Sequence, residues 1–242
     1  MKSLIALLAL CVAFTGDAEA QAPAKTDNLT PGYLLVLGRS TDRAKIIAYS
    51  SQLPPIYAAT GGRYIGQGRP GGGVTCVYGM CEGRSSVIAQ WADAKSIEAF
   101  WWGDAYRKVV PMRDGAGVFT VVGIKGAADV QPFTAGALLI ATVNANAAGS
   151  NLTATQTWLA AASADSGARL LAPFTSAAVI PLEGDALYNR VALLSFESKE
   201  KRDTFAVSES TQALIKHALP QSLISIIAVD APPTAPPVAV VK

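Results

Sequence analysis

The sequence is poor in the residues that build metal sites and poor in charge. It holds one histidine and three cysteines, so a site made of several imidazole or thiolate ligands cannot be assembled. Lys and Arg number 20 against 18 Asp and Glu, and the absence of a basic run argues against phosphate binding. A metal site made of carboxylates stays open but has no motif in the sequence. We therefore expect no metal, no organic cofactor and no nucleic-acid partner.

Apolar side chains are abundant. Half of the residues are hydrophobic and 16% are charged, which excludes an intrinsically disordered chain. A length of 242 residues is enough for one large domain or two small ones, each with a core of ordinary size. The composition thus predicts a folded protein.

The first 20 residues have the order of a secretory signal peptide. Lys2 gives a positive start, residues 3–14 are apolar, and Ala18 and Ala20 are the small residues that signal peptidase needs before Gln21. An uncleaved anchor is the alternative, but the apolar stretch is shorter than the roughly 20 residues of a membrane span. We expect a secreted protein, in the simplest case periplasmic, with no membrane contact after cleavage.

Two cysteines, Cys76 and Cys81, remain after the signal peptide is removed. An even count in an oxidising compartment favours a bond between them, and Gly79 allows a hairpin that brings the two side chains together. A redox centre usually has two residues between its cysteines, and a metal site needs further ligands. The spacing therefore predicts a structural disulfide.

The order of expected elements occurs twice, at a period of about 105 residues. An apolar strand begins at Gly32 and again at Gly136. Trp91 and Phe196 each end a later strand and precede a capped helix. Residues 42–60 have a helical pattern between the first two strands of the first half. The resulting order, β-α-β-β-α-β in each half, is that of a ferredoxin-like unit.

A four-stranded sheet with helices on one face leaves its other face bare. We expect an α+β fold in which two tandem ferredoxin-like repeats pack these faces together as a pseudo-dimeric α+β barrel. In the alternative, each half pairs with another copy of the chain, so self-association stays open. The expected organisation is a signal peptide at 1–20, a tail at 21–30, a first repeat at 31–126, a linker at 127–135, a second repeat at 136–230 and a Pro-rich tail at 231–242.

The first half resembles the DUF1330 family of dimeric α+β barrel proteins, from Gly32 to Gly126. The residues that carry the resemblance are Gly32, Tyr33, Gly61, Gly62, Arg63, Tyr64, Trp91, the stretch 100–106, Pro111 and Arg113. The second half looks like a diverged copy, with Thr211 opposite Tyr106 and Ala218 opposite Arg113. The wider superfamily includes isomerases, cyclases and monooxygenases, so the resemblance implies a fold rather than one activity.

Four polar residues of the first half are candidates for ligand binding, namely Arg63, Tyr64, Tyr106 and Arg113. Two guanidiniums and two phenols could hold a carboxylate or an enolate between sheet and helices. Alternatively, the arginines are ordinary rim groups and the tyrosines pack with their hydroxyls in water.

Other features carry weaker signals. Trp101 and Trp102 are adjacent and cannot both face one core, so we expect one of them to line a groove, an interface or solvent. His217, near a helix end, is interpreted as structural, although some relatives of this barrel bind haem through histidine. Residues 66–73 are rich in glycine but lack the lysine of a phosphate loop, and they predict a hairpin.

Three functions stay open. The first is binding of a small molecule, an apolar or aromatic acid, by the first half. The second is a cofactor-independent isomerase or monooxygenase in which Tyr106 or Tyr64 is the acid or base. The third is a protein-interaction module that uses Trp101 and Trp102.

Overall fold

The structure is a computed structural model and describes residues 30–127, 133, 136–148, 150, 152–218 and 222–232. The expected signal peptide, nearly all of both tails and most of the linker lie outside these residues. Within the described residues, no helix has the length and apolar character needed to cross a membrane.

The first half builds an antiparallel sheet around its first strand. β1 (Gly32–Ser40) pairs with β4 (Ser85–Trp91) on one side and with β5 (Gly117–Lys125) on the other. β2 (Arg63–Pro70) lies beyond β4. The sheet order in this half is therefore β2-β4-β1-β5.

The second half has the same order. β6 (Ala137–Val143) pairs with β9 (Arg190–Phe196) and with β10 (Leu223–Asp230), and the short β7 (Arg169–Leu170) lies beyond β9. The order β7-β9-β6-β10 repeats that of the first half. The expected α+β class is thus confirmed.

Two further strands cross between the halves, and sequence analysis did not predict this exchange. β3 (Gly73–Gly79) pairs with β10 of the second half, and β8 (Val179–Glu183) pairs with β5 of the first. Each comes between the second and third strands of its own half. With them, the described residues form one ten-stranded sheet, β7-β9-β6-β10-β3-β2-β4-β1-β5-β8.

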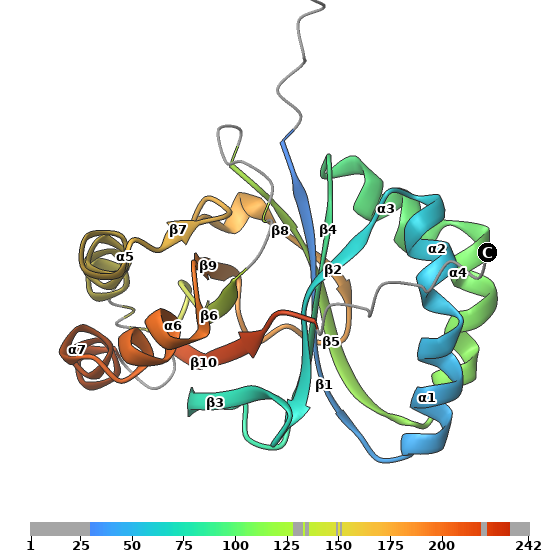
Figure 1. Ribbon diagram of the computed structural model, residues 1–242, viewed down its shortest axis with the longest axis horizontal. Helices are drawn as coiled ribbons and strands as arrows, with labels where there is room; N and C mark the ends of the chain where they lie inside the picture. The colour runs from blue at the N-terminus through green and yellow to red at the C-terminus, as the bar shows by residue number, and fades with distance from the viewer. Residues whose placement is uncertain are drawn as a thin grey trace, which may run out of the picture.

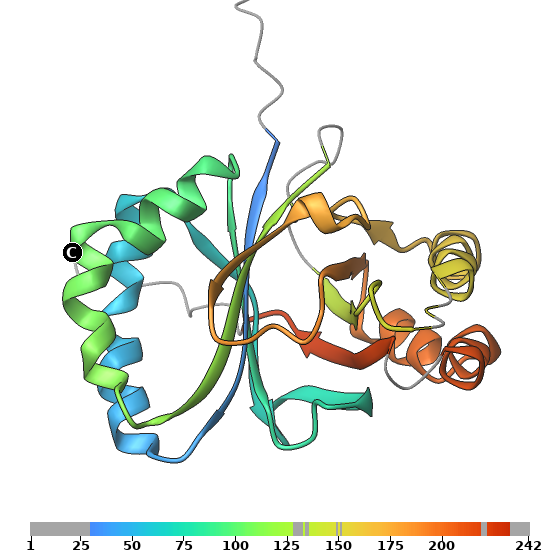
Figure 2. The ribbon, with the colours of Figure 1, turned by 180° about the vertical axis from the view of Figure 1, so that it is seen from behind.

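The helices lie on the two outer sides of the strands, as Figures 1 and 2 show from opposite directions. Beside the strands of the first half lie α1 (Arg43–Ser51), α2 (Leu53–Ala59), α3 (Lys95–Trp102), α4 (Asp104–Val109) and the 3₁₀ turn η1 (Val110–Arg113). Beside the strands of the second half lie α5 (Leu152–Ser166), α6 (Lys199–Ala206) and α7 (Glu209–His217). A second 3₁₀ turn, η2 (Ser176–Ala178), precedes β8. Asp42, Ser198 and Ser208 cap α1, α6 and α7 through side-chain oxygens.

The core follows from alternation along the strands. On β1, Leu35 and Leu37 point into a buried cluster that also contains Leu138 and Leu193 of the second half. Leu34, one residue away, belongs to a different cluster that packs against the first-half helices. The sheet faces without helices therefore pack on each other, as expected from the sequence.

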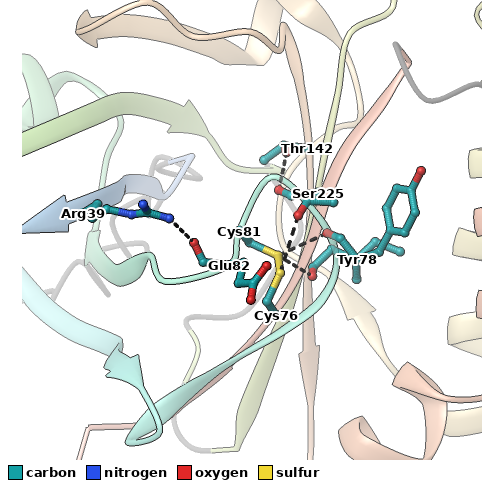
Figure 3. Close-up of a disulfide and its surroundings, with 9 residues drawn as sticks. Arg39, Cys76, Tyr78, Cys81, Glu82, Thr142 and Ser225 are labelled. Carbon is teal, nitrogen blue, oxygen red and sulfur yellow. Dashed lines mark hydrogen bonds between the residues drawn. A yellow bond between two sulfur atoms is a disulfide. The ribbon is translucent and has the colours of Figure 1, made fainter.

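A disulfide joins Cys76 of β3 to Cys81, with 5.3 Å between their Cα atoms (Figure 3). Between them, Gly79 has a φ of 81°, in the left-handed region that favours glycine, and this turns the chain back. β10 runs alongside, and its Ser225 hydroxyl lies 2.6 Å from that of Thr142. The predicted bond is present, and it lies at the end of β3, the first-half strand that pairs with β10 of the second half.

Candidate functional site

A cavity of about 150 Å³ lies between sheet and helices of the first half, and we call it the first-half cavity. It is mainly apolar, and a cavity of this volume can hold one aromatic ring. The side chains that matter for its chemistry are Leu34, Val36, Tyr49, Leu53, Tyr57, Tyr64, Tyr106, Arg113, Phe119 and Val121.

The cavity exists because α1 does not seal against the sheet. None of the nine residues of α1 is buried, whereas α2 buries Leu53 and Tyr57. Beneath α1, Leu34 and Val36 of β1 present their side chains on the helix-facing side of the sheet. The space between these strand residues and α1 remains as the cavity.

The neutral polar groups of the lining come from the tyrosines Tyr49, Tyr57, Tyr64 and Tyr106 and from Ser40, Ser50, Ser85, Ser86 and Gln67. The hydroxyls of Tyr49 and Tyr106 lie 2.9 Å apart and share a hydrogen bond, and the rings of Tyr57 and Tyr64 are 4.6 Å apart. Burial, and then the neighbouring Tyr49, raise the pKa of Tyr106 well above its usual range. Burial likewise raises the pKa of Tyr64. These phenols therefore stay protonated near neutral pH and can donate hydrogen bonds.

Arg113 is already paired. Its two terminal nitrogens donate to the two carboxylate oxygens of Glu183, over 2.7 and 2.5 Å. The guanidinium is 9% exposed and lies 5.4 Å from the ring centre of Tyr49 and 4.9 Å from that of Phe119. Burial lowers the pKa of Arg113, but the bond to Glu183 and the adjacent phenols outweigh burial and raise it, so the side chain remains a cation.

Glu183 comes from β8 of the second half, so both halves contribute to this site. Its partner across the sheet is Val121 of β5, which itself lines the cavity. Gly184, the next residue, has a φ of 71°, and a Cβ there would lie 2.3 Å from the carbonyl oxygen of Phe119. The turn after Glu183 therefore needs glycine, and it helps to fix the carboxylate over Arg113.

Three of the predicted residues, Tyr64, Tyr106 and Arg113, line the cavity. Arg63 does not, because strand alternation places it on the opposite side of β2 from Tyr64. There it donates to the side-chain oxygen of Gln90, over 2.9 Å, and to the carbonyl oxygen of Phe133. Arg63 thus links Phe133 to β4 of the sheet.

The two adjacent tryptophans separate as their spacing predicts, and neither lines the cavity. Trp101 is buried, with its ring 4.8 Å from that of Tyr106. Trp102 is 59% exposed, and the guanidinium of Arg107 lies over its ring. Trp101 therefore packs against the ring of Tyr106, and Trp102 faces solvent.

Sequence reasoning missed Tyr49, Tyr57, Phe119 and Glu183. Tyr49 and Tyr57 had a usable signal, because Tyr49, Leu53 and Tyr57 recur every four residues and so share one face of a helical stretch. Phe119 precedes the buried part of β5 without any distinguishing pattern. Glu183 had no local signal, because its role depends on the strand exchange.

In the second half, the space between α5 and β6 is filled by a buried cluster that contains Trp158, Leu139 and Ala141. Trp158 of α5 is 1% exposed, and its indole nitrogen donates to the hydroxyl of Thr211 over 2.9 Å. Thr211 and Ala218, which the sequence offset of 105 residues aligns with Tyr106 and Arg113, are both buried. His217, the last residue of α7, borders a groove between α5 and α7 that opens to solvent.

Residues 31–127 match the family described as "Domain of unknown function (DUF1330)", and the match spans the first half alone. No curated protein matches the chain.

Several solved structures are similar to the chain, and three of them serve as examples. A suggested monooxygenase from Lactobacillus acidophilus is 12% identical over 84% of this chain and 94% of its own, with a TM-score of 0.42. A protein of unknown function from Rhodopseudomonas palustris is 19% identical over 43% and 85%, with a TM-score of 0.32. A heme-binding protein from Thermus thermophilus is 9% identical over 83% and 91%, with a TM-score of 0.35.

Proposed function

We propose that the first-half cavity binds a small, largely apolar molecule of about the size of one aromatic ring. The observation that carries this proposal is the asymmetry between the halves. Tyr49, Tyr106 and Arg113 line open space between helices and sheet in the first half, whereas Trp158 packs in a closed core cluster between α5 and β6 in the second. A pocket that served only as a packing defect would have no reason to gather hydrogen-bonding groups.

Binding is favoured over catalysis by the state of the phenols. An isomerase or monooxygenase that used Tyr106 or Tyr64 as a base would need a pKa close to neutral. Burial moves the pKa of both groups in the opposite direction. Both tyrosines are therefore suited to orient a ligand by donating a hydrogen bond.

We also propose that residues 31–126 and 136–230 are tandem ferredoxin-like repeats that form a pseudo-dimeric barrel. The repeated strand order and the shared central core support this proposal. The protein is proposed to be secreted after removal of residues 1–20. An oxidising destination is consistent with the Cys76–Cys81 bond.

Thermal unfolding and calorimetry with toluene and phenol test the binding function. We expect both compounds to raise the Tm of the wild-type protein, because a ligand that binds only the native state stabilises it. Val36→Phe fills the cavity from β1 and should abolish the shift. Val118→Phe is the matched control, because Val118 is exposed on β5 and does not line the cavity. Absence of binding to the wild type, or equal binding to Val36→Phe, would overturn the proposal.

A further inference from the structure

We infer that Glu183 makes the first-half cavity selective for neutral ligands and closes it to carboxylates. The inference rests on the proposed binding function and goes further, because it assigns the chemical class of the ligand and a specificity role to a residue of the second half. It also reverses the expectation of an acidic ligand that the arginines suggested.

The lining of the cavity contains a single charged side chain among its described residues, that of Arg113. An arginine fork is the usual partner of a ligand carboxylate because it donates two parallel hydrogen bonds. In this protein, both of those bonds go to Glu183.

A ligand carboxylate would have to share Arg113 with Glu183 or displace it, and both are unfavourable. A ligand carboxylate that approached Arg113 would lie beside the carboxylate of Glu183 on the same guanidinium, and the two negative charges would repel each other. Displacing Glu183 instead would break two charge-assisted hydrogen bonds to an arginine that is 9% exposed. Either route penalises an anion, whereas a neutral ligand leaves the pair intact.

With Arg113 paired, the neutral groups of the lining are the ones that can recognise a ligand. The phenols of Tyr49, Tyr64 and Tyr106 are neutral donors in an apolar lining, and Phe119 adds an aromatic face. These phenols, the serine hydroxyls and the amide of Gln67 are neutral hydrogen-bonding groups around an apolar, ring-sized space, and this suits a neutral aromatic molecule that carries a carbonyl or hydroxyl group. This is the ligand class that we assign to the cavity.

Acetophenone and benzoate are suitable probes, because they have nearly the same shape and differ in charge. Calorimetry at pH 7 should show that the wild type binds acetophenone at least tenfold more tightly than benzoate. Glu183→Gln removes the negative charge and one of the two acceptors beside Arg113, and it should raise the affinity for benzoate by roughly tenfold or more, the effect of one hydrogen bond to a charged group. Its affinity for acetophenone should change by less than about threefold.

Two further variants complete the test. Glu183→Asp keeps the charge and should leave benzoate affinity within about threefold of the wild type, and a tenfold gain would overturn the role of charge. Glu98→Gln removes an exposed carboxylate on α3 and should change neither affinity.

The outcomes separate the two proposals. If the wild type binds benzoate as tightly as acetophenone, the selectivity inference fails and the binding function stands. If Glu183→Gln folds and gains no affinity for benzoate, Glu183 does not set the selectivity. If neither probe binds to any of these proteins and toluene and phenol also fail, the binding function itself is overturned.

Discussion

The indole nitrogen of Trp158 donates to the hydroxyl of Thr211 in the core of the second half, and both side chains are buried. The hydroxyl of Thr211 in turn donates to the carbonyl oxygen of Phe205, and this orients the hydroxyl to accept from the indole. Trp158 thus fills the space between α5 and β6, whereas the first half keeps an open cavity between α1 and β1.

Trp158→Ala should therefore create a second cavity. We expect the free energy of unfolding, measured with urea, to fall by about 3–5 kcal/mol, because a large buried ring is removed and the surroundings collapse only in part. Indole added in solution should restore part of the loss by filling the space.

Trp102→Ala is the control for this experiment. Trp102 is the more exposed of the two adjacent tryptophans, so its replacement should cost less than about 0.5 kcal/mol, with no rescue by indole. If the two variants lost equal stability, the assignment of Trp158 to the core of the second half would be wrong.

The sequence predicted much of this arrangement and missed what depends on contacts between distant segments. The repeat of strand ends at Trp91 and Phe196 was readable, and so was the cysteine pair. The stretch 42–60, expected as one helix, forms two, because Pro54 and Pro55 lack the backbone N–H that would continue α1 and are tolerated in the first turn of α2.

The exchanged strands show where local patterns stop being informative. Residues 179–183 alternate weakly, and nothing in them identifies β5 as their partner. Only that pairing brings Glu183 to Arg113, about 70 positions earlier in the chain. For this reason Arg113 looked like a free anion-binding group in the sequence, and the structure shows it paired.

The hydrogen bond between Tyr49 and Tyr106 should be measurable by a double-mutant cycle. Tyr106→Phe leaves the Tyr49 hydroxyl without its partner, and the reverse holds for Tyr49→Phe. Each single variant should lose about 1–2 kcal/mol of stability, and the double variant should lose less than the sum, with a coupling of roughly 0.5–1.5 kcal/mol. Strictly additive losses would mean that the two phenols do not interact in solution.

Stability should fall in alkaline solution because of the buried phenols. Burial raises the pKa of Tyr33 to about 12, whereas in the unfolded chain it titrates near the ordinary value of 10. Above pH 10 the unfolded state therefore loses its proton first, and stability falls until the pH passes about 12.

Tyr33→Phe isolates the contribution of this one group. Urea unfolding between pH 9 and pH 11 should show a slope that is shallower than that of the wild type by up to about 1.4 kcal/mol per pH unit above pH 10. An unchanged slope would indicate that Tyr33 ionises in the folded protein as easily as in the unfolded chain.

Export should leave a mark on the intact mass. When the full sequence is expressed in a bacterium, the mature protein should begin at Gln21 and be lighter by two hydrogens because of the Cys76–Cys81 bond. Ala20→Arg places a large charged residue at the cleavage site and should retain residues 1–20. A mature chain that starts at Met1 and stays in the cytoplasm would contradict the proposed secretion.

Opening the disulfide should weaken the strand exchange more than the rest of the fold. Closure of a loop of about six residues stabilises a protein by about 2 kcal/mol in the chain-entropy account, so Cys76→Ser combined with Cys81→Ser should lower the free energy of unfolding by that amount. Hydrogen exchange should show the loss concentrated in β3 and in the β10 amides that face it, because the bond closes the end of that strand. The pairing of β8 with β5 is the internal control, since it lies outside the closed loop, and its protection should fall only with global stability. Equal loss at both exchanged strands would mean that the bond acts on the whole fold and does not specifically secure β3.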